Sequence, residues 1–444
     1  ILTEEEYNLP PEQWNPLIEK RGKEVVQRDT EILYYYFDKF RKSREFNIGL
    51  SIADTSLRTY RSRFMPITTI SMPEFLEPYA SESYRGGRTE AYYIEDPVPL
   101  RYYDINSLYP YVMKTNKFSV MFYKGYEHIN PETIEKEKDN FNFLVNCDVE
   151  FPKTLTRLPI VYKVPINGTK KLTQKYTLKN VWLTGAEVLE AVKEGANVTI
   201  HKAYQFVNMD LFSKFVDYFY SKRLEYKKKV KEAKDPTERA NAEVMVSFYK
   251  LVLNSLYGKF GQRKAHVKIL TEGEIFEIVK EKAEREGLYR VIVGDKSGKK
   301  RVYTYHGDFV SYRDHENEKA KYPIIIASEI TAFARLYNYQ WQKRIGFDCV
   351  YYTDTDSFMT CESAKIPTGD DLGELKREYE DVSYVLIHDP KDYVFLDENF
   401  HVLGRKLKGI PRDAEEVNEY TYQFWHIPSL YTAQLLIGYL QEVG

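Results

Sequence analysis

Two apolar stretches of the chain predict strands next to acidic residues. Residues 349–361 carry apolar and aromatic side chains on both sides of Asp354 and Asp356, a pattern typical of a buried β-hairpin with its acids near the turn. Residues 100–103 form a second apolar run and predict a strand that ends at Asp104. The Ser-Leu-Tyr-Pro sequence that follows should break this strand and begin a new element.

Helical periodicity accounts for many of the other apolar positions. Asp235 is suited to cap a helix whose first turn holds a proline, and Gly258 is suited to end that helix. Thr184 and Glu187 form a capping box at the start of another helix. Residues 263–322 are charged and predict a region rich in strands. The expected helices cover about residues 11–42, a short segment from Thr184, 210–233, 236–257 and 323–341.

The acidic residues indicate a metal site. Period-2 geometry can bring Asp354 and Asp356 to the same region, while Asp104 lies at the end of the other predicted strand. Buried carboxylates repel each other unless a cation neutralises them, and Mg²⁺ takes oxygen ligands of this kind. Taken alone, an Asp-x-Asp sequence also fits a solvated turn, so the pair by itself leaves both interpretations open.

The predicted helix that ends at Gly258 presents a face suited to a nucleotide. Lys250, Asn254 and Tyr257 are spaced at i, i+4 and i+7 and therefore share this face. A cation, an amide and an aromatic ring suit a triphosphate that carries a base. Arg223 and Lys227 lie four residues apart on one face of the preceding predicted helix, a pattern that a solvated basic face also has.

These segments, in this order, resemble motifs A, B and C of the family B DNA polymerases. The three matches are D-x-x-S-L-Y-P from Asp104, K-x-x-x-N-S-x-Y-G from Lys250 and Y-x-D-T-D-S from Tyr352. The resemblance covers nearly the whole chain and is nearest to the protein-primed branch found in bacteriophages, adenoviruses and linear plasmids. Residues 84–87 (Tyr-Arg-Gly-Gly) resemble the YxGG motif of this branch, and residues 391–393 (Lys-Asp-Tyr) resemble its KxY motif.

The resemblance implies an α+β fold of the right-hand polymerase type, with palm, fingers, a short thumb and two insertions. The first insertion would dock a priming protein, and the second would support strand displacement and processivity. The implied domains are an exonuclease remnant (1–80), the linker motif and palm start (81–114), the first insertion (115–207), the fingers (208–262), the second insertion (263–322), the palm with its catalytic hairpin (323–414) and a partial thumb (415–444).

The resemblance also implies the role of each site residue. The catalytic carboxylates would be Asp104, Asp354 and Asp356. Two Mg²⁺ or Mn²⁺ ions would be held by Asp104, Asp356 and the Ile105 carbonyl. The nucleotide-binding residues would be Tyr109, Arg223, Lys227, Lys250, Asn254 and Tyr257, of which Tyr109 would exclude a ribose 2′-hydroxyl. The DNA-binding residues would be Tyr84, Gly86, Gly87, Lys391, Tyr393, Lys406 and Lys408.

The partners implied by the resemblance are primer-template DNA, deoxynucleoside triphosphates and a terminal priming protein. The net charge of −2, from 64 Lys+Arg and 66 Asp+Glu, gives no overall attraction to nucleic acid, so DNA must be met by local basic clusters. Three such clusters occur, at residues 222–231, 299–301 and 405–408.

The cysteines and the apolar runs give indications of the cellular location. Cys147, Cys349 and Cys361 are odd in number and match no zinc pattern, which predicts reduced thiols inside a cell. No signal peptide or membrane-length apolar run is visible, so no membrane partner is expected. By resemblance, the location is the cytoplasm of a bacterial host or the compartment where a virus or linear plasmid replicates.

The remaining expectations concern proofreading, the chain ends and alternative functions. Asp29 matches the Asp of the Tyr-x-x-x-Asp exonuclease motif, but Val25 stands at its Tyr position, so no proofreading is expected. Both chain ends are interpreted as truncated. A non-catalytic DNA-binding remnant is an alternative that the intact acids disfavour. A reverse transcriptase is another alternative, and it is disfavoured because Thr355 separates aspartates that are adjacent in that class.

Overall fold

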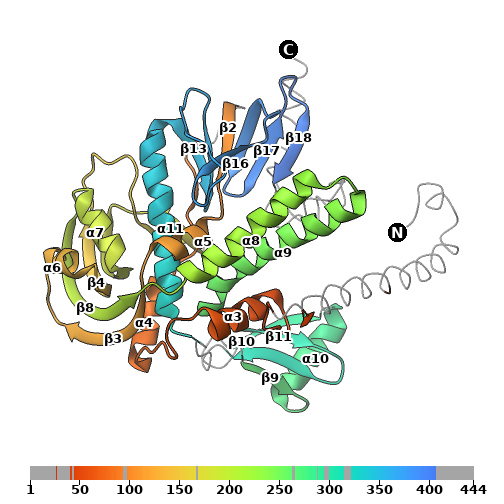
Figure 1. Cartoon of the computed structure of the whole chain (residues 1–444). Helices are drawn as coiled ribbons and strands as arrows, with labels where there is room; N and C mark the ends of the chain where they lie inside the picture. The colour runs from red at the N-terminus through yellow and green to blue at the C-terminus, as the bar shows by residue number, and fades with distance from the viewer. Residues whose placement is uncertain are drawn as a thin grey trace, which may run out of the picture. The chain divides into compact units, whose positions relative to one another are not determined.

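The chain forms two compact units in the computed structural model shown in Figure 1. The smaller unit combines residues 1–66 with 214–259, and the larger combines 67–213 with 260–444. Each unit is described by itself. The residues described are 27, 41–42, 45–93, 98–166, 169–262, 266–287, 289–294, 300–314 and 322–406.

The smaller unit is built on three helices, α3 (Ile52–Arg63), α8 (Ser213–Glu232) and α9 (Pro236–Phe260). The predicted cap of α9 is confirmed, because the Asp235 carboxylate accepts a hydrogen bond from the Glu238 amide at 2.9 Å. The rings of Phe46 and Phe219 stack at 5.6 Å, and the Ser56 hydroxyl donates to the Val252 carbonyl at 2.8 Å. Most of the helix predicted at residues 11–42 lies outside the described residues.

The predicted end of α9 at Gly258 is wrong, because the helix continues to Phe260. A glycine inside a helix costs about 1 kcal/mol relative to alanine. Phe260 is 1% exposed, with its ring 5.5 Å from that of Phe212. Burying a phenylalanine side chain stabilises by about 1.5–3 kcal/mol, so tertiary packing outweighs the local stop signal.

An antiparallel sheet of eight strands forms the centre of the larger unit. Its order is β1-β13-β14-β2-β16-β17-β18, and β15 also pairs with β2. Tyr102, Tyr352, Met359 and Phe395 belong to the apolar cluster of this sheet. The strands are β1 (Thr89–Ala91), β2 (Val98–Ile105), β13 (Val350–Asp354), β14 (Ser357–Cys361), β15 (Leu375–Glu378), β16 (Tyr384–Asp389), β17 (Asp392–Leu396) and β18 (Val402–Lys406).

Helix α11 (Ile324–Ile345) is the main buried helix of this unit. It extends four residues past the predicted end at Trp341, and sixteen of its residues are buried. Figure 1 shows α11 running between the central sheet and a second sheet. It packs against α4 (Glu77–Ser83) and α5 (Leu108–Thr115). Short 3₁₀ turns lie at Glu74–Leu76 (η1) and Phe347–Cys349 (η3).

The second sheet has the order β3-β8-β4-β7, and its strands lie in the segment for which a first insertion is predicted. The capping box from Thr184 to Glu187 is confirmed at the start of α7. The elements are β3 (Phe118–Tyr126), α6 (Pro131–Glu137), β4 (Phe141–Glu150), β7 (Thr177–Thr184), α7 (Gly185–Lys193) and β8 (Asn197–Met209), with a separate hairpin of β5 (Val161–Ile166) and β6 (Thr169–Gln174).

The third sheet, β10-β11-β12-β9, lies in the segment predicted to be rich in strands. It also carries helix α10, which the sequence analysis missed. Phe276, Val279 and Ala283 of α10 are buried at helical spacing against the sheet, a signal that the many charges around them obscured. The elements are β9 (His266–Leu270), α10 (Glu274–Glu286), β10 (Arg290–Gly294), β11 (Lys300–Tyr305) and β12 (Val310–Asp314).

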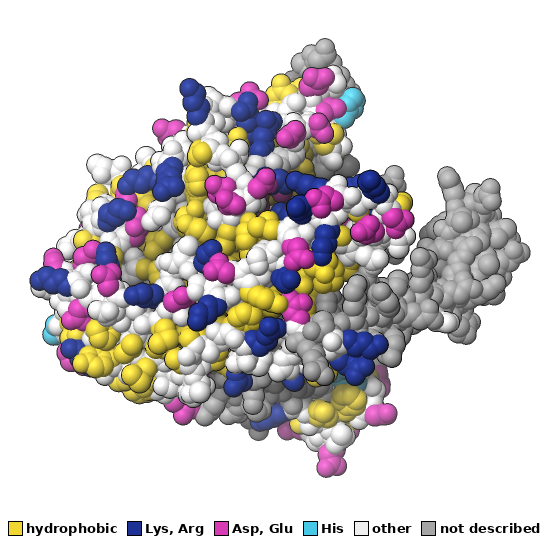
Figure 2. Space-filling model, viewed as in Figure 1, with side chains coloured by type: hydrophobic (Ala, Val, Ile, Leu, Met, Phe, Trp, Pro, Cys, Tyr) yellow, Lys and Arg dark blue, Asp and Glu magenta, His cyan; other side chains and the backbone are white. Residues whose placement is uncertain are grey.

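Two surface properties complete the description. Hydrophobic side chains gather over β3 on the face seen in Figure 2, where Phe75, Met121 and Tyr123 are each more than half exposed. Within the described ranges, no helix combines the length and hydropathy that a membrane crossing requires.

The expectation of reduced cysteines is wrong for one pair. A disulfide joins Cys349 to Cys361, whose Cα atoms are 5.0 Å apart, while Cys147 is a buried free thiol. The two half-cystines lie opposite each other where β13 begins and β14 ends, next to the pair Val350 and Thr360. The hairpin register creates this proximity, which the spacing of the cysteines alone did not reveal.

Candidate active site

The predicted acidic hairpin is formed by β13 and β14. Asp354 pairs with Ser357, so Thr355 and Asp356 make a two-residue turn. Thr355 has φ of 62°, a left-handed conformation that is uncommon for a β-branched residue. Its amide donates to the Arg88 carbonyl at 2.6 Å, and this long-range bond holds the turn in that conformation.

Asp104 lies beside this turn, on the neighbouring strand. β2 pairs with β14 so that Asp104 is opposite Ser357, and the Ile105 amide donates to the Asp356 carbonyl at 2.6 Å. The chain then turns sharply at Ser107, which has φ of 53°, and enters α5 as predicted. The structure therefore brings motif A and motif C together at one edge of the sheet.

The two acids of the hairpin have opposite electrostatic environments. Burial would raise the pKa of Asp354, but the ammonium groups of Lys391 and Lys406 outweigh burial and hold that pKa below its usual value. Their Nζ atoms lie 2.6 Å and 3.1 Å from the Asp354 carboxylate oxygens. Burial raises the pKa of Asp356 to about 6, and the charge of Asp354 acts in the same direction. Asp354 is thus a neutralised carboxylate, whereas Asp356 lacks comparable compensation.

The carboxylates beside the turn are candidate ligands for a divalent cation. Within the described residues, no group of three or more His, Cys, Asp or Glu side chains is arranged to hold a metal ion. Two lysines contact the Asp354 carboxylate, so Asp104 and Asp356 are the other two candidate carboxylates at this edge. Mg²⁺ commonly binds through one or two carboxylates together with substrate phosphates, so these residues fit such an ion.

The KxY segment lies where β16 turns into β17, and it contacts the acidic hairpin. The Lys391 amide donates to the Tyr352 hydroxyl at 2.9 Å. Tyr393 is 3% exposed, with its ring 5.4 Å from that of Tyr352, and the Lys406 ammonium lies 5.7 Å from the Tyr393 ring centre. Lys391 and Lys406 therefore contact Asp354, while Tyr393 lies in the core. Lys408 is outside the described residues.

The YRGG segment passes against the same turn. A Cβ atom at Gly87 would lie 2.3 Å from the Thr355 hydroxyl oxygen, so only glycine fits there, whereas a Cβ at Gly86 would meet nothing within 4 Å. The Tyr84 hydroxyl lies beside Gly261. Arg85 is 1% exposed, so its side chain is enclosed by protein.

Three buried polar residues on α11 were missed by the sequence analysis. Arg335 donates to the carbonyls of Arg85 and Gly86 at 2.8 and 3.0 Å, and Asn338 donates to the Thr355 carbonyl at 3.1 Å. Gln342 donates to the Asn338 side-chain oxygen at 2.7 Å. Their spacing of three and four residues, which places them on one face of the helix, is the signal that could have found them.

The remaining predicted residues are distributed over both units. Tyr109 is half-buried in the first turn of α5, close in sequence to Asp104. The five predicted nucleotide-binding residues of the fingers lie on the helix pair of the smaller unit, and their convergence with the carboxylates stays a prediction. They are Arg223 and Lys227 on α8 and Lys250, Asn254 and Tyr257 on α9. Asp29 lies outside the described residues.

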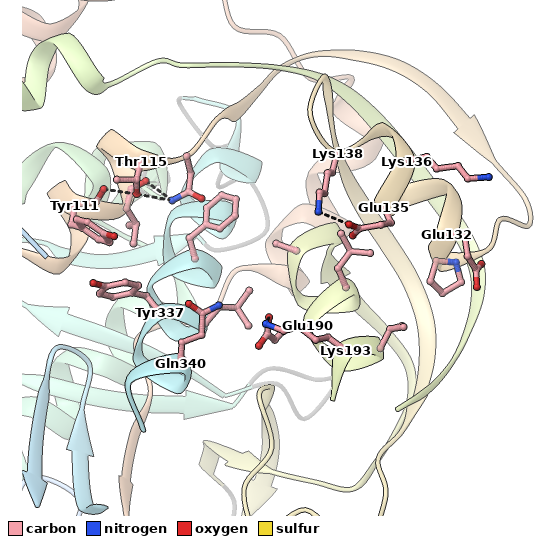
Figure 3. A pocket seen from close by; sticks show the side chains of 18 of the residues that line it. Tyr111, Thr115, Glu132, Glu135, Lys136, Lys138, Glu190, Lys193, Tyr337 and Gln340 are labelled. Atoms are coloured by element: carbon pink, nitrogen blue, oxygen red, sulfur yellow. Dashed lines mark hydrogen bonds and ion pairs between the residues drawn. The ribbon is translucent and has the colours of Figure 1, made fainter. Parts of the chain in front are cut away.

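A cavity of about 960 Å³ lies among α5, α6, α7 and α11. Figure 3 shows Tyr111 and Tyr337 on one side of it and the ion-paired Glu135 and Lys138 on the other. None of the three acidic residues of motifs A and C lines this cavity, so it is separate from the candidate site.

Comparisons with known proteins agree with the arrangement of motifs. The family described as DNA polymerase type B, organellar and viral, matches residues 4–345. A probable DNA polymerase of Podospora anserina is 25% identical over 467 residues, covering 95% of this chain and 36% of that protein. The DNA-directed DNA polymerase of Enterobacteria phage PRD1 is 29% identical over 243 residues, covering 52% of this chain and 37% of that protein. The chain thus spans little more than a third of these relatives.

A solved structure shows the same fold. Phi29 DNA polymerase complexed with primer-template DNA and incoming nucleotide substrates aligns with a TM-score of 0.56 and 17% sequence identity, covering 91% of this chain and 66% of that chain. This likeness confirms the predicted α+β fold of the right-hand type.

Proposed function

Because the chain belongs to the organellar and viral type B DNA polymerases, we propose that it adds deoxynucleotides to a DNA 3′-hydroxyl under the direction of a template. One observation carries this proposal: Asp104 and Asp356 meet at one edge of the sheet, while two lysines neutralise Asp354. Phosphoryl transfer depends mainly on positioning and on charge stabilisation, and this arrangement is suited to both.

The roles of the acidic residues follow from their environments. Asp104, Asp356 and the Ile105 carbonyl would hold two Mg²⁺ or Mn²⁺ ions, and such ions supply activation of the 3′-hydroxyl and neutralisation of the leaving pyrophosphate. Asp354 would act differently, because its carboxylate anchors Lys391 and Lys406. Through these contacts it would hold the basic strand ends in place beside the primer.

The DNA and nucleotide contacts are proposed by residue type and by resemblance. Lysines bind phosphate as point charges, so Lys391, Lys406 and Lys408 would neutralise the DNA backbone without reading its sequence. Tyr84, Gly86, Gly87 and Tyr393 would shape the same path. Tyr109 would lie beneath the sugar and exclude a 2′-hydroxyl. Arg223, Lys227, Lys250, Asn254 and Tyr257 would bind the triphosphate and the base.

The biological setting is proposed from the relatives. The phage and fungal polymerases among the matches fit replication of a viral or linear-plasmid genome inside a host cell. A terminal priming protein is proposed as a further partner from the motif resemblance to the protein-primed branch. The phi29 complex with primer-template DNA and nucleotides supports DNA and deoxynucleoside triphosphates as substrates here.

Primer extension with and without Mg²⁺ or Mn²⁺ tests the proposal. Asp104→Asn and Asp356→Asn should each lower extension at least 100-fold, because a neutral amide is a poor ligand for a divalent cation; a factor of 100 corresponds to about 2.7 kcal/mol. DNA binding by both variants should stay near wild type. The control is Asp148→Asn, which removes a carboxylate bound to the Asn180 amide and to His201 in another sheet.

Two results would contradict the proposal. Extension by Asp104→Asn or Asp356→Asn at the rate of the Asp148→Asn control would rule out the metal assignment. Binding of primer-template without metal-dependent extension by the wild type would favour the non-catalytic alternative. Running the assay on DNA and RNA templates distinguishes a DNA-directed enzyme from a reverse transcriptase.

A further inference from the structure

A stripe of buried polar residues runs along α11 behind the acidic hairpin. Arg335, Asn338 and Gln342 follow one another at intervals of three and four residues and therefore share one face of the helix. All three are at most 2% exposed. A buried polar side chain destabilises the fold unless its hydrogen bonds are made, so the partners of these residues are informative.

Asn338 bonds directly to the acidic hairpin. Its amide nitrogen donates to the Thr353 hydroxyl oxygen at 2.7 Å and to the Thr355 carbonyl at 3.1 Å. The Thr353 hydroxyl in turn donates to the Ser357 carbonyl at 3.0 Å. These bonds reach both strands and the residue with positive φ, which lies between the two acids.

Gln342 fixes the orientation of the Asn338 amide. Its nitrogen donates to the Asn338 side-chain oxygen at 2.7 Å, which leaves the Asn338 nitrogen facing the hairpin. The Gln342 oxygen accepts from the Tyr92 hydroxyl at 3.0 Å and from an Arg157 nitrogen at 3.1 Å. Because arginine can only donate, the direction of every bond in this chain of amides is set from the Arg157 end.

Arg157 also holds the start of the hairpin. Its guanidinium donates to the carbonyls of Phe347 and Val350 at 2.7 and 2.6 Å, and it stacks on the Tyr92 ring at 3.3 Å. Strand β13 is therefore bonded at both ends, by Arg157 at Val350 and by Asn338 at the turn. Arg157 precedes β5, so a residue from the region of the predicted first insertion takes part in this support.

We propose that Asn338 is a positioning residue for the catalytic turn, and that Gln342 and Arg157 set the direction in which its amide donates. This inference deepens the proposed function and rests on it. Asn338 holds the Thr355 carbonyl and thereby the backbone from which the side chains of Asp354 and Asp356 extend. A displacement of about 1 Å in a reacting group can lower a rate about 100-fold, so losing this support should act on turnover and metal use.

The test compares Asn338→Asp and Asn338→Leu with a matched control. The aspartate keeps the shape of the side chain but cannot donate at pH 8, and the leucine keeps an approximate volume without any polar atom. The control is Thr331→Val, which removes a buried hydroxyl of the same helix that bonds only to α11 carbonyls, those of Ala327 and Ser328. Thermal unfolding by circular dichroism shows whether each variant is folded.

Both Asn338 variants should extend a primer at least tenfold more slowly than Thr331→Val, and their half-saturating Mg²⁺ concentration should rise. Their affinity for primer-template should stay within twofold of wild type. Gln342→Glu, which cannot donate to the Asn338 oxygen at pH 8, should show the same changes to a smaller degree. A residue that only stabilised the fold would change the unfolding temperature without changing the Mg²⁺ requirement.

Hydrogen exchange of the amides of residues 353–357 supplies a readout that does not depend on activity. Exchange there should be faster in both Asn338 variants than in Thr331→Val. Wild-type turnover and Mg²⁺ requirement in both Asn338 variants would overturn the inference while leaving the proposed function intact. If the wild type itself fails to extend primers, the proposed function fails, and unchanged exchange at residues 353–357 would then still overturn the positioning role.

Discussion

Glu187 provides a quantitative test of how the larger unit is held together. This carboxylate is 1% exposed and lies between two buried guanidinium groups, with one oxygen 2.5 Å from an Arg85 nitrogen and 2.8 Å from an Arg335 nitrogen. Its other oxygen accepts from the Thr184 amide at 3.1 Å, which caps α7. Arg85 belongs to the YRGG segment, and Arg335 also donates to the carbonyls of Arg85 and Gly86, so this buried group connects α7, α11 and the loop beside the acidic turn.

The contribution of Glu187 to the free energy of unfolding follows from the pKa of its carboxyl group. Burial alone would raise the pKa of Glu187, but the charges of Arg85 and Arg335 outweigh burial and lower it from 4.5 to about 2. A group with a depressed pKa in the folded state contributes stability above its unfolded pKa and loses that contribution as the pH falls from 4.5 towards 2. The shift corresponds to about 3 kcal/mol in total, of which about 1.4 kcal/mol is lost by pH 3.5.

Urea unfolding of wild type and Glu187→Gln at pH 7 and pH 3.5 measures this contribution. The variant should be less stable by several kcal/mol at pH 7, because it leaves two buried guanidinium groups without a counter-charge. The free-energy gap between the two proteins should narrow by about 1.4 kcal/mol at pH 3.5, since other titrating groups are common to both. Val188→Ala, a buried apolar truncation on the same helix, should show a gap independent of pH.

A gap between wild type and Glu187→Gln that is the same at both pH values would refute this reasoning. If the difference in unfolding free energy between wild type and Val188→Ala narrows by the same amount, the change comes from the denatured state and not from Glu187.

The other predictions concern a second buried acid, a close backbone approach and the disulfide. Burial raises the pKa of Glu329 to about 7. The free energy of unfolding of the wild type should therefore fall by up to about 3 kcal/mol as the pH rises from 4.5 through 7. Glu329→Gln should lack this loss in urea unfolding, and the same pH dependence of the unfolding free energy in both proteins would contradict the prediction. Gly87→Ala should slow primer extension strongly because a Cβ would meet the Thr355 hydroxyl. Gly294→Ala, in β10, where a Cβ meets nothing within 4 Å, should stay near wild type, and equal rates for the two variants would refute the close approach. Reduction of the Cys349–Cys361 disulfide, which joins residues 12 apart in sequence, should lower the unfolding free energy by about 3 kcal/mol. The double serine variant should match reduced wild type and ignore dithiothreitol, and a wild type insensitive to reductant would count against the disulfide.

Elements specified by local chemistry could be predicted from the sequence. The acidic hairpin, the capping box at Thr184 and the Asp235 cap each depend on residues within a few positions of one another. The elements that were missed depend on distant partners. Phe260 extends α9 past Gly258 because it packs in the larger unit, and α10 is recognisable mainly from the sheet that covers it.

In the candidate site too, some features could be predicted from the sequence and others depend on distant partners. Motif spacing was sufficient to select Asp104 and Asp356, because the strand pairing that joins them follows from two strongly apolar segments. The partners of Asp354 were not predictable, since Lys391 and Lys406 are 37 and 52 residues away in sequence. They lie next to β17 and in β18, which β14, β2 and β16 separate from β13 in the strand order, so only the three-dimensional fold brings them to Asp354. The spacing of Asn338 and Gln342 was visible, but the groups to which they bond depend on how α11 packs.

The contrast between Asp354 and Asp356 explains how an Asp-x-Asp turn can hold two acids with different roles. Both side chains come from one tight turn, so proximity alone would leave two like charges that repel each other. Two lysines contact the Asp354 carboxylate and lower its pKa, while the charge of Asp354 still raises the pKa of Asp356. Asp356 has no comparable partner pair, and burial destabilises its charged form. A cation would therefore stabilise the charged form of Asp356 more than that of Asp354, which supports the proposal that metal binds on the side that Asp356 shares with Asp104.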